Sequence, residues 1–210
     1  MIFDTNFNYL FVVLILFSIF YLFLQYKSNL VTYINTKSGR QYLVRKCDDT
    51  VSENNDSIAA ANLLDDLAEN GIILINHFNT YTNDSTYKHY AYYQRFKDFI
   101  RRLTRNYDPN TISESMPNNE YTSYTINKGK KIVFCIRQKP NSNTPNNPCG
   151  NLVSLNTMMF VFLHELAHLG TCGIGHHKQF WCNMAFLLDV ADLVLIFADK
   201  FKRCALPITA

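Results

Sequence analysis

The sequence lacks a C-x-x-C pair, contains few glycine, proline and tryptophan residues, and has a small net charge. Its 210 residues include six Cys, seven Gly, six Pro and one Trp, and the formal net charge is +3. The cysteines are far apart, which excludes a zinc ribbon or a thioredoxin-type motif and gives no disulfide framework. So small a charge does not predict a nucleic-acid partner, and none is expected. Walker and dinucleotide-binding patterns are absent as well.

Apolar and aromatic residues are abundant instead. Hydrophobic residues make up 48% of the chain, aromatic residues 14% and charged residues 18%. This composition excludes a disordered chain and a coiled coil. The length suits one globular domain of ordinary size.

The longest apolar run lies near the N-terminus, over residues 7–24 (FNYLFVVLILFSIFYLFL). As a helix it would be roughly 27 Å long, about the thickness of a hydrocarbon core. A cleaved signal peptide would carry a basic start and a small-residue cleavage site, and neither is present. The run therefore predicts an uncleaved transmembrane anchor over residues 1–26 that contacts the lipid bilayer through residues 7–24.

Basic residues follow this run and none precedes it, which predicts a single-pass membrane protein with its C-terminal domain in the cytosol. Cysteines in that compartment are mostly reduced. The basic residues nearest the predicted span are Lys27, Lys37, Arg40, Arg45 and Lys46.

The first half of the remaining chain predicts a linker followed by helices. Residues 27–55 are polar and basic, and we expect a juxtamembrane linker with one short strand at Gln41–Arg45. Apolar residues at helical spacing predict a helix over residues 57–78, with Gly71 either ending it or tolerated inside it. A second helix is predicted from about Tyr87 to Tyr107.

The second half predicts a hairpin and two further helices. The β-prone runs Tyr121–Asn127 and Lys131–Arg137 are separated by Lys128-Gly129-Lys130, which indicates a tight turn. Residues 139–150 predict a loop. Apolar helices are predicted at about Leu152–Gly170 and Lys178–Phe201. The expected fold class is therefore α+β, mostly helical, with a small sheet.

The predicted helix over 152–170 contains the sequence His164-Glu165-Leu166-Ala167-His168. Positions i and i+4 project from one helix face, so both imidazoles can bind one metal ion. Glu165 is offset around the helix, where it can reach a water on the metal without binding the metal. The surrounding residues are apolar, and polar groups buried among them are costly unless paired. A bound zinc ion would offset that cost; carboxylates from elsewhere in the core are the alternative.

A third ligand is predicted directly after this helix. The glycine-rich segment 170–175 indicates a turn, and His176 and His177 follow it. Three histidines with an open fourth position are typical of a catalytic zinc site, whereas a structural site uses four protein ligands. Spacing alone does not choose between His176 and His177.

The block H-E-L-A-H, a glycine-bearing loop and then His-x-x-x-Phe-Trp resembles the WLM and SprT-like zinc metallopeptidases, which share the gluzincin-type, zincin-like fold. In those families the last ligand precedes a Phe by four positions, which favours His176, before Phe180 and Trp181. The hairpin sequence is also similar to predicted membrane-anchored metallopeptidases of large DNA viruses. The resemblance implies a viral WLM-like metallopeptidase domain over residues 56–205, in a host or virion membrane.

The resemblance has limits. Thr171 and Ile174 occupy the Gly and His positions of the metzincin pattern, which excludes that family. A thermolysin-like enzyme would take a carboxylate ligand from the last helix, which makes Asp189 and Asp192 minor alternatives. A membrane anchor also argues against the DNA-repair role of cellular WLM and SprT proteins.

These features together predict a zinc-dependent peptidase that acts on protein or peptide substrates, with His164, His168 and His176 as ligands and Glu165 as general base. The resemblance implies that a substrate strand pairs with the hairpin edge near residues 133–137. The candidate donors to the tetrahedral oxyanion are His177, Tyr121 and Tyr124.

Two alternatives stay open. The zinc could be purely structural, in a non-catalytic membrane protein that acts in assembly, although such a site has no need of Glu165. Cysteine could also take part, with Cys135 or Cys172 as nucleophile, or with Cys172 or Cys182 as a metal ligand.

Overall fold

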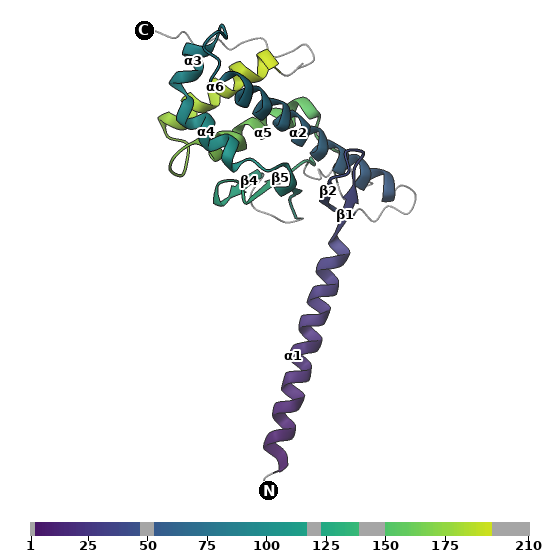
Figure 1. Ribbon diagram of the computed structural model, residues 1–210. Helices are drawn as coiled ribbons and strands as arrows, with labels where there is room; N and C mark the ends of the chain where they lie inside the picture. Colours follow the sequence, from purple (N-terminus) through teal and green to yellow (C-terminus); the bar gives the residue numbers. More distant parts are fainter. Residues whose placement is uncertain (1–2, 47–52, 117–122, 139–149, 195–210) are drawn as a thin grey trace.

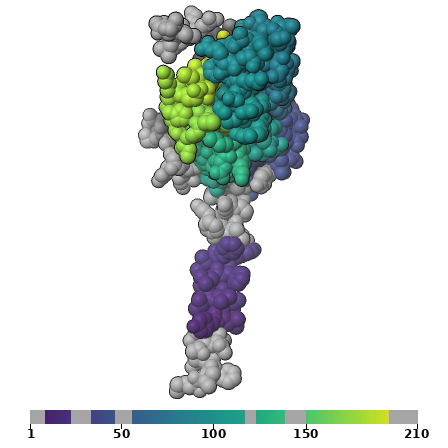
Figure 2. All heavy atoms as spheres, turned by 60° about the vertical axis from the view of Figure 1, so that its left-hand side comes forward, coloured from purple at the N-terminus to yellow at the C-terminus, as the bar shows by residue number. Residues whose placement is uncertain are grey.

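The structure is a computed structural model that describes residues 3–46, 53–116, 123–138 and 150–194. It begins with the long helix α1 (Phe3–Leu30). Figure 1 shows α1 extending away from the other elements, and in Figure 2 the coloured part of α1 stands as a narrow column below the rounded body. The side chains described on this helix are those of residues 9–22, and nearly all are apolar and exposed.

The predicted transmembrane anchor is wrong. Among the described residues, no helix combines the length and the apolar character that crossing a membrane requires. The prediction of a single-pass membrane protein with a cytosolic C-terminal domain depended on that anchor and is wrong with it.

A β-hairpin follows α1. Strands β1 (Val31–Asn35) and β2 (Gln41–Arg45) pair antiparallel, with Val31 opposite Arg45. The strand predicted at Gln41–Arg45 is therefore confirmed, whereas β1 was not predicted. Tyr42 and Val44 of β2 are fully buried, so this hairpin is part of the core.

Helix α2 (Glu53–Tyr81) carries much of the core. Its buried side chains include Leu64, Leu67 and Phe78. Gly71 lies inside the helix and does not end it, and a Cβ at this position would collide with the ring of Tyr107.

The single helix predicted over Tyr87–Tyr107 is two helices, α3 (Tyr90–Arg95) and α4 (Lys97–Asn106). Phe96 separates them because its backbone leaves the helical region, with φ −112° and ψ 13°. The Phe96 ring stacks on Phe186, with ring centroids 4.1 Å apart. The structure thus joins a helix break to an aromatic contact that sequence periodicity does not show.

The predicted hairpin is confirmed and belongs to a three-stranded sheet. Strands β4 (Ser123–Ile126) and β5 (Lys131–Phe134) pair antiparallel, with the short 3-10 turn η2 (Asn127–Gly129) between them. The turn η1 (Pro109–Thr111) leads into β3 (Ile112–Glu114), which pairs parallel to β5 and was not predicted.

The strand order β3-β5-β4 places β5 in the centre of the sheet. The expectation that a substrate pairs along residues 133–137 is therefore wrong where β5 runs, because Val133 and Phe134 already have partners on both sides. Among the described strands, β4 and β3 form the sheet edges.

Helices α5 (Leu155–Gly170) and α6 (Lys178–Val194) complete the body. Ser154 caps α5 by accepting a hydrogen bond from the backbone N–H of Thr157. Helix α5 packs against α4, α6 and α2, and β4 lies against it. The fold is α+β and mostly helical, with small sheets, as predicted. The predicted end of the last helix, Phe201, lies outside the described residues.

Candidate metal centre

Helix α5 presents its two histidines on one face, one turn apart. The ring centroids of His164 and His168 are 5.0 Å apart, and both side chains are half-buried. Glu165, the next residue after His164, is 4% exposed. A helix that is apolar on its other faces thus holds two imidazoles and one carboxylate in fixed positions.

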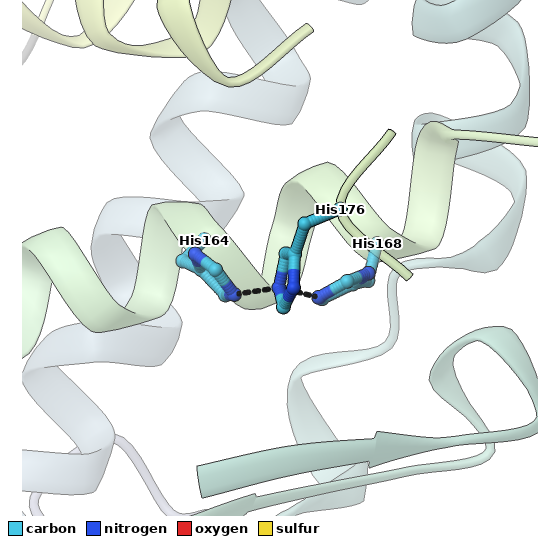
Figure 3. Close-up of side chains that lie close together, drawn as sticks. All are labelled: His164, His168 and His176. Carbon is cyan, nitrogen blue, oxygen red and sulfur yellow. Dashed lines mark hydrogen bonds between the residues drawn. The ribbon is translucent and has the colours of Figure 1, made fainter. Parts of the chain in front are cut away.

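The loop after α5 brings in the third histidine. Gly173 and Gly175 have φ of 85° and 86°, a left-handed conformation that favours glycine, and they allow the chain to turn back. Nε2 of His176 lies 2.9 Å from Nε2 of His164 and 3.2 Å from Nε2 of His168. Figure 3 shows the ring of His176 between the other two.

His177, the other candidate for third ligand, lies apart from this group. Its Nε2 is 3.0 Å from the carbonyl oxygen of Cys172, to which the ring can donate a hydrogen bond within the loop. The geometry therefore brings together His164, His168 and His176, which we call the histidine cluster.

The nitrogens of the histidine cluster have more close contacts than hydrogen bonds can satisfy. Each Nε2 carries either one proton or one lone pair. His176 can thus make one well-directed hydrogen bond through Nε2, yet two imidazole nitrogens lie within 3.2 Å of it. A cation that receives three lone pairs would resolve this conflict.

Burial and nearby charges favour the neutral form of the two helix histidines, His164 and His168. Burial and the neighbouring His176 lower the pKa of His164. Burial, with His164, His176 and Lys128, lowers the pKa of His168 to about 4. Neutral imidazoles offer the lone pairs that a metal ion needs.

The cluster matches zinc in size and donor type. One nitrogen from each histidine lies within 4.8 Å of the others. Tetrahedral coordination with Zn–N distances of ~2.0–2.1 Å places ligand nitrogens about 3.3 Å apart. Within the described part of the chain, no cysteine or carboxylate joins the three histidines as a further ligand.

The alternative ligands lie elsewhere. Asp189 accepts a hydrogen bond of 2.9 Å from the hydroxyl of Tyr92, and Asp192 is exposed. Cys172 and Cys182 are exposed free thiols outside the histidine cluster. Cys135, the other cysteine considered, is half-buried, and its Sγ contacts the carbonyl of Arg137.

The β4 strand contacts Glu165 directly. The hydroxyl of Thr125 donates a hydrogen bond of 2.7 Å to Oε2 of Glu165. Burial raises the pKa of Glu165, and the bond from Thr125 acts in the opposite direction. Sequence analysis did not identify Thr125, because only the packing of β4 on α5 brings it to the carboxylate.

Aromatic side chains at the start of α6 surround the cluster. The buried Phe180 ring lies 4.4 Å from His168 and 4.9 Å from His164, measured between centroids. The Trp181 ring lies 5.7 Å from that of His176 and is 53% exposed. Phe180 thus packs behind the imidazoles, while Trp181 forms part of the open surface beside them.

The three candidate oxyanion donors differ in position. His177 contacts the carbonyl of Cys172, as described above. Tyr124 is a half-buried residue of β4, next to Thr125. Tyr121 lies outside the described residues.

Comparison with known proteins finds relatives among viruses. Over 122 residues, 55% of this chain, the sequence is 29% identical to Uncharacterized protein R325 of Acanthamoeba polyphaga mimivirus. Over 77 residues, 37% of the chain, it is 34% identical to Uncharacterized protein 136R of Invertebrate iridescent virus 6. The matches span 58% and 39% of the lengths of these relatives. No family model matches the chain, and no solved structure matches it.

Proposed function

We propose that this protein is a zinc-dependent peptidase in which His164, His168 and His176 hold the metal and Glu165 is the general base. The observation that carries the proposal is the approach of His176 Nε2 to both helix imidazoles, at 2.9 and 3.2 Å. A buried carboxylate next to these imidazoles gives the site a reactive group that metal binding alone does not need.

A zinc ion in this site would polarise a scissile carbonyl and lower the pKa of a coordinated water. Glu165 accepts the proton from the attacking water and passes it to the leaving amine. Thr125 supports this role because its hydrogen bond fixes one carboxylate oxygen, Oε2, and so orients the carboxylate.

The substrate would be an extended peptide that pairs with β4. This strand is an edge of the described sheet, and Thr125 on it contacts Glu165. A peptide bound along such an edge gains backbone hydrogen bonds, and its scissile bond would pass near the carboxylate. Strand β4 thus replaces β5 as the proposed substrate-binding edge.

A measurement of metal content together with one substitution tests the proposal. The purified protein should contain about one zinc ion per chain by elemental analysis. Glu165→Gln should keep that zinc while hydrolysis of a peptide library falls about 10²–10⁴-fold, because the general base is lost. Asp192→Asn, which changes an exposed carboxylate on α6, is the matched control and should behave like the wild type.

Two outcomes would contradict the peptidase. Wild-type protein without zinc would remove the metal centre altogether. Zinc binding with equal hydrolysis, or equal lack of it, in wild type and Glu165→Gln would instead favour the structural alternative. In that case His164→Ala should lower the melting temperature, and Glu165→Gln should change nothing.

A further inference from the structure

The turn between β4 and β5 has an unusual backbone. Asn127 and Lys128 both have positive φ, 47° and 55°, and Gly129 follows with φ 106°. The left-handed region is strained for a residue with a Cβ, and Asn tolerates it better than Lys does. Such a conformation persists where surrounding contacts hold it.

The side chain of Lys128 supplies those contacts. Its ammonium donates to the carbonyl oxygens of His168, Thr171 and Gly173, at 3.0, 2.8 and 2.6 Å. A lysine ammonium has three N–H donors, and these three bonds use all of them. Three polar contacts therefore hold the side chain in one place.

The three acceptors belong to the segment that joins the cluster histidines. The carbonyl of His168 is one of the last in α5, where helix carbonyls lack intrahelical partners and the helix dipole favours a cation. Thr171 and Gly173 are in the loop that leads to His176. One ammonium thus ties the end of the helix to the loop that carries the third imidazole.

Neighbouring side chains hold the same region from the helix side. Asn106 donates to the carbonyl of Leu169 at 2.9 Å, and Arg102 donates to that of Gly170 at 2.7 Å. These two bonds fix the end of α5, while Lys128 reaches both α5 and the loop beyond it.

We propose that Lys128 is a positioning residue that holds the loop of residues 171–175 so that His176 meets the two helix histidines in metal-binding geometry. The inference rests on the proposed zinc centre and adds a residue that acts on its affinity. The same hairpin also carries Thr125, so one short supersecondary element supports both Glu165 and the third ligand.

Zinc affinity of the purified full-length chain tests this role, measured by competition with a chromophoric chelator. Lys128→Met keeps the aliphatic stem and removes the ammonium, and we expect about 10–100-fold weaker zinc binding, the range typical of residues that support ligands. Lys130→Met, an exposed lysine of the same turn, is the matched control and should stay within about twofold of wild type.

Lys128→Gly separates positioning from general stability. Glycine fits the left-handed backbone, so the melting temperature of the metal-free protein should be kept, while zinc affinity should fall as in Lys128→Met. Cobalt-substituted protein gives a second readout, because the visible absorption of tetrahedral Co²⁺ should change in both Lys128 variants and not in Lys130→Met.

The outcomes distinguish failure of the positioning role of Lys128 from failure of the proposed zinc centre. Wild-type zinc affinity in Lys128→Gly, or in a folded Lys128→Met, would overturn the positioning role and leave the zinc centre intact. Equal losses of affinity in the Lys128 and Lys130 variants would overturn it as well. Failure of the wild-type protein itself to bind zinc would overturn the proposed metal centre and this inference together.

Discussion

Two clusters of polar side chains in the body of this protein differ in whether their members are paired with groups of opposite charge. In the first, which we call the arginine cluster, Nε of Arg137 lies 2.7 Å from Glu114 and its Nη1 lies 2.7 Å from Asp56. The backbone N–H of Arg45 donates to the other oxygen of Glu114 at 2.8 Å. In the histidine cluster, three nitrogen atoms face one another without an opposite charge among them.

This difference shows which of the two clusters has all its charged groups paired within the protein. Buried charges are tolerated when each is paired, and Arg137 and Glu114, both 1% exposed in their side chains, meet that condition. In the histidine cluster, three nitrogen atoms that can each bind a metal ion lie close to one another. In the first arrangement the opposite charges pair within the protein, whereas the second is suited to a cation from solution.

The largest effect on folding should come from breaking the arginine cluster. Glu114→Gln leaves a buried guanidinium opposite a neutral amide, and we expect the free energy of unfolding to fall by about 3–5 kcal/mol. Urea denaturation followed by circular dichroism measures this. Glu69→Gln, which weakens a half-exposed ion pair with Arg40, is the control and should cost less than about 1 kcal/mol. If both variants lost the same free energy of unfolding, the distinction between a buried ion pair and an ion pair at the surface would be refuted.

Breaking the histidine cluster should instead affect metal binding. His176→Ala removes a ligand, so zinc affinity should fall more than the 10–100-fold typical of residues behind ligands, while the stability of the metal-free protein changes by less than about 1 kcal/mol. Isothermal titration with zinc and urea denaturation in chelator measure the two quantities. His177→Ala is the matched control, since its ring contacts Cys172 instead. A larger loss of affinity in His177→Ala would mean that the loop adopts another arrangement when metal binds.

The two clusters also differ in how far the sequence predicts them. His164, Glu165 and His168 lie within one helical turn or so, and helix geometry alone brings them together. His176 is only a short loop away, although spacing left it equal with His177 until the resemblance was considered. Local spacing therefore predicted most of the histidine cluster.

The arginine cluster was not predicted, because its members meet only through tertiary structure. Glu114 reaches Arg137 through β3, a strand of three residues that is too short to show a periodic pattern and pairs in parallel with β5. Thr125 and Lys128 were missed for the same reason. In the sequence, Lys128 belongs to a basic turn that suggests solvent exposure, and only the fold places it on the carbonyls after α5.

The same holds for the overall fold: elements with a strong local sequence pattern were predicted, and elements that depend on tertiary contacts were not. Helices α2, α5 and α6 and the β4–β5 hairpin have strong local patterns and were predicted, as was the α+β class. Strand β1 directly follows α1 in a stretch interpreted as a linker, and its pairing with β2 depends on a turn at residues 36–40. The transmembrane prediction relied on the composition of one apolar run, whereas no helix among the described residues is both long and apolar enough to span a membrane.

The smallest expected effect is on the pH dependence of stability, at a third polar site. There one carboxylate of α2, that of Asp65, joins this helix to the β1–β2 hairpin. Burial alone would raise the pKa of Asp65, but hydrogen bonds from Ser38 at 2.7 Å and Arg40 at 2.9 Å outweigh it and lower the pKa. A carboxyl whose pKa is lower in the folded state stabilises the fold above its unfolded pKa of about 3.9, and that stability is lost as the pH falls through the folded value.

Asp65→Asn should therefore lower the melting temperature by about 2–4 °C near pH 6, the shift expected for about 1 kcal/mol in a chain of this size. The difference from wild type should shrink as the pH falls below about 3.9, because protons then bind the carboxyl of the unfolded wild-type chain and favour unfolding. Adding chelator should leave the difference unchanged, because Asp65 contacts Ser38 and Arg40 and has no contact with the histidine cluster among the interactions described. A difference that stays constant from pH 6 to pH 3, or that disappears with chelator, would show that Asp65 acts through something other than its charge.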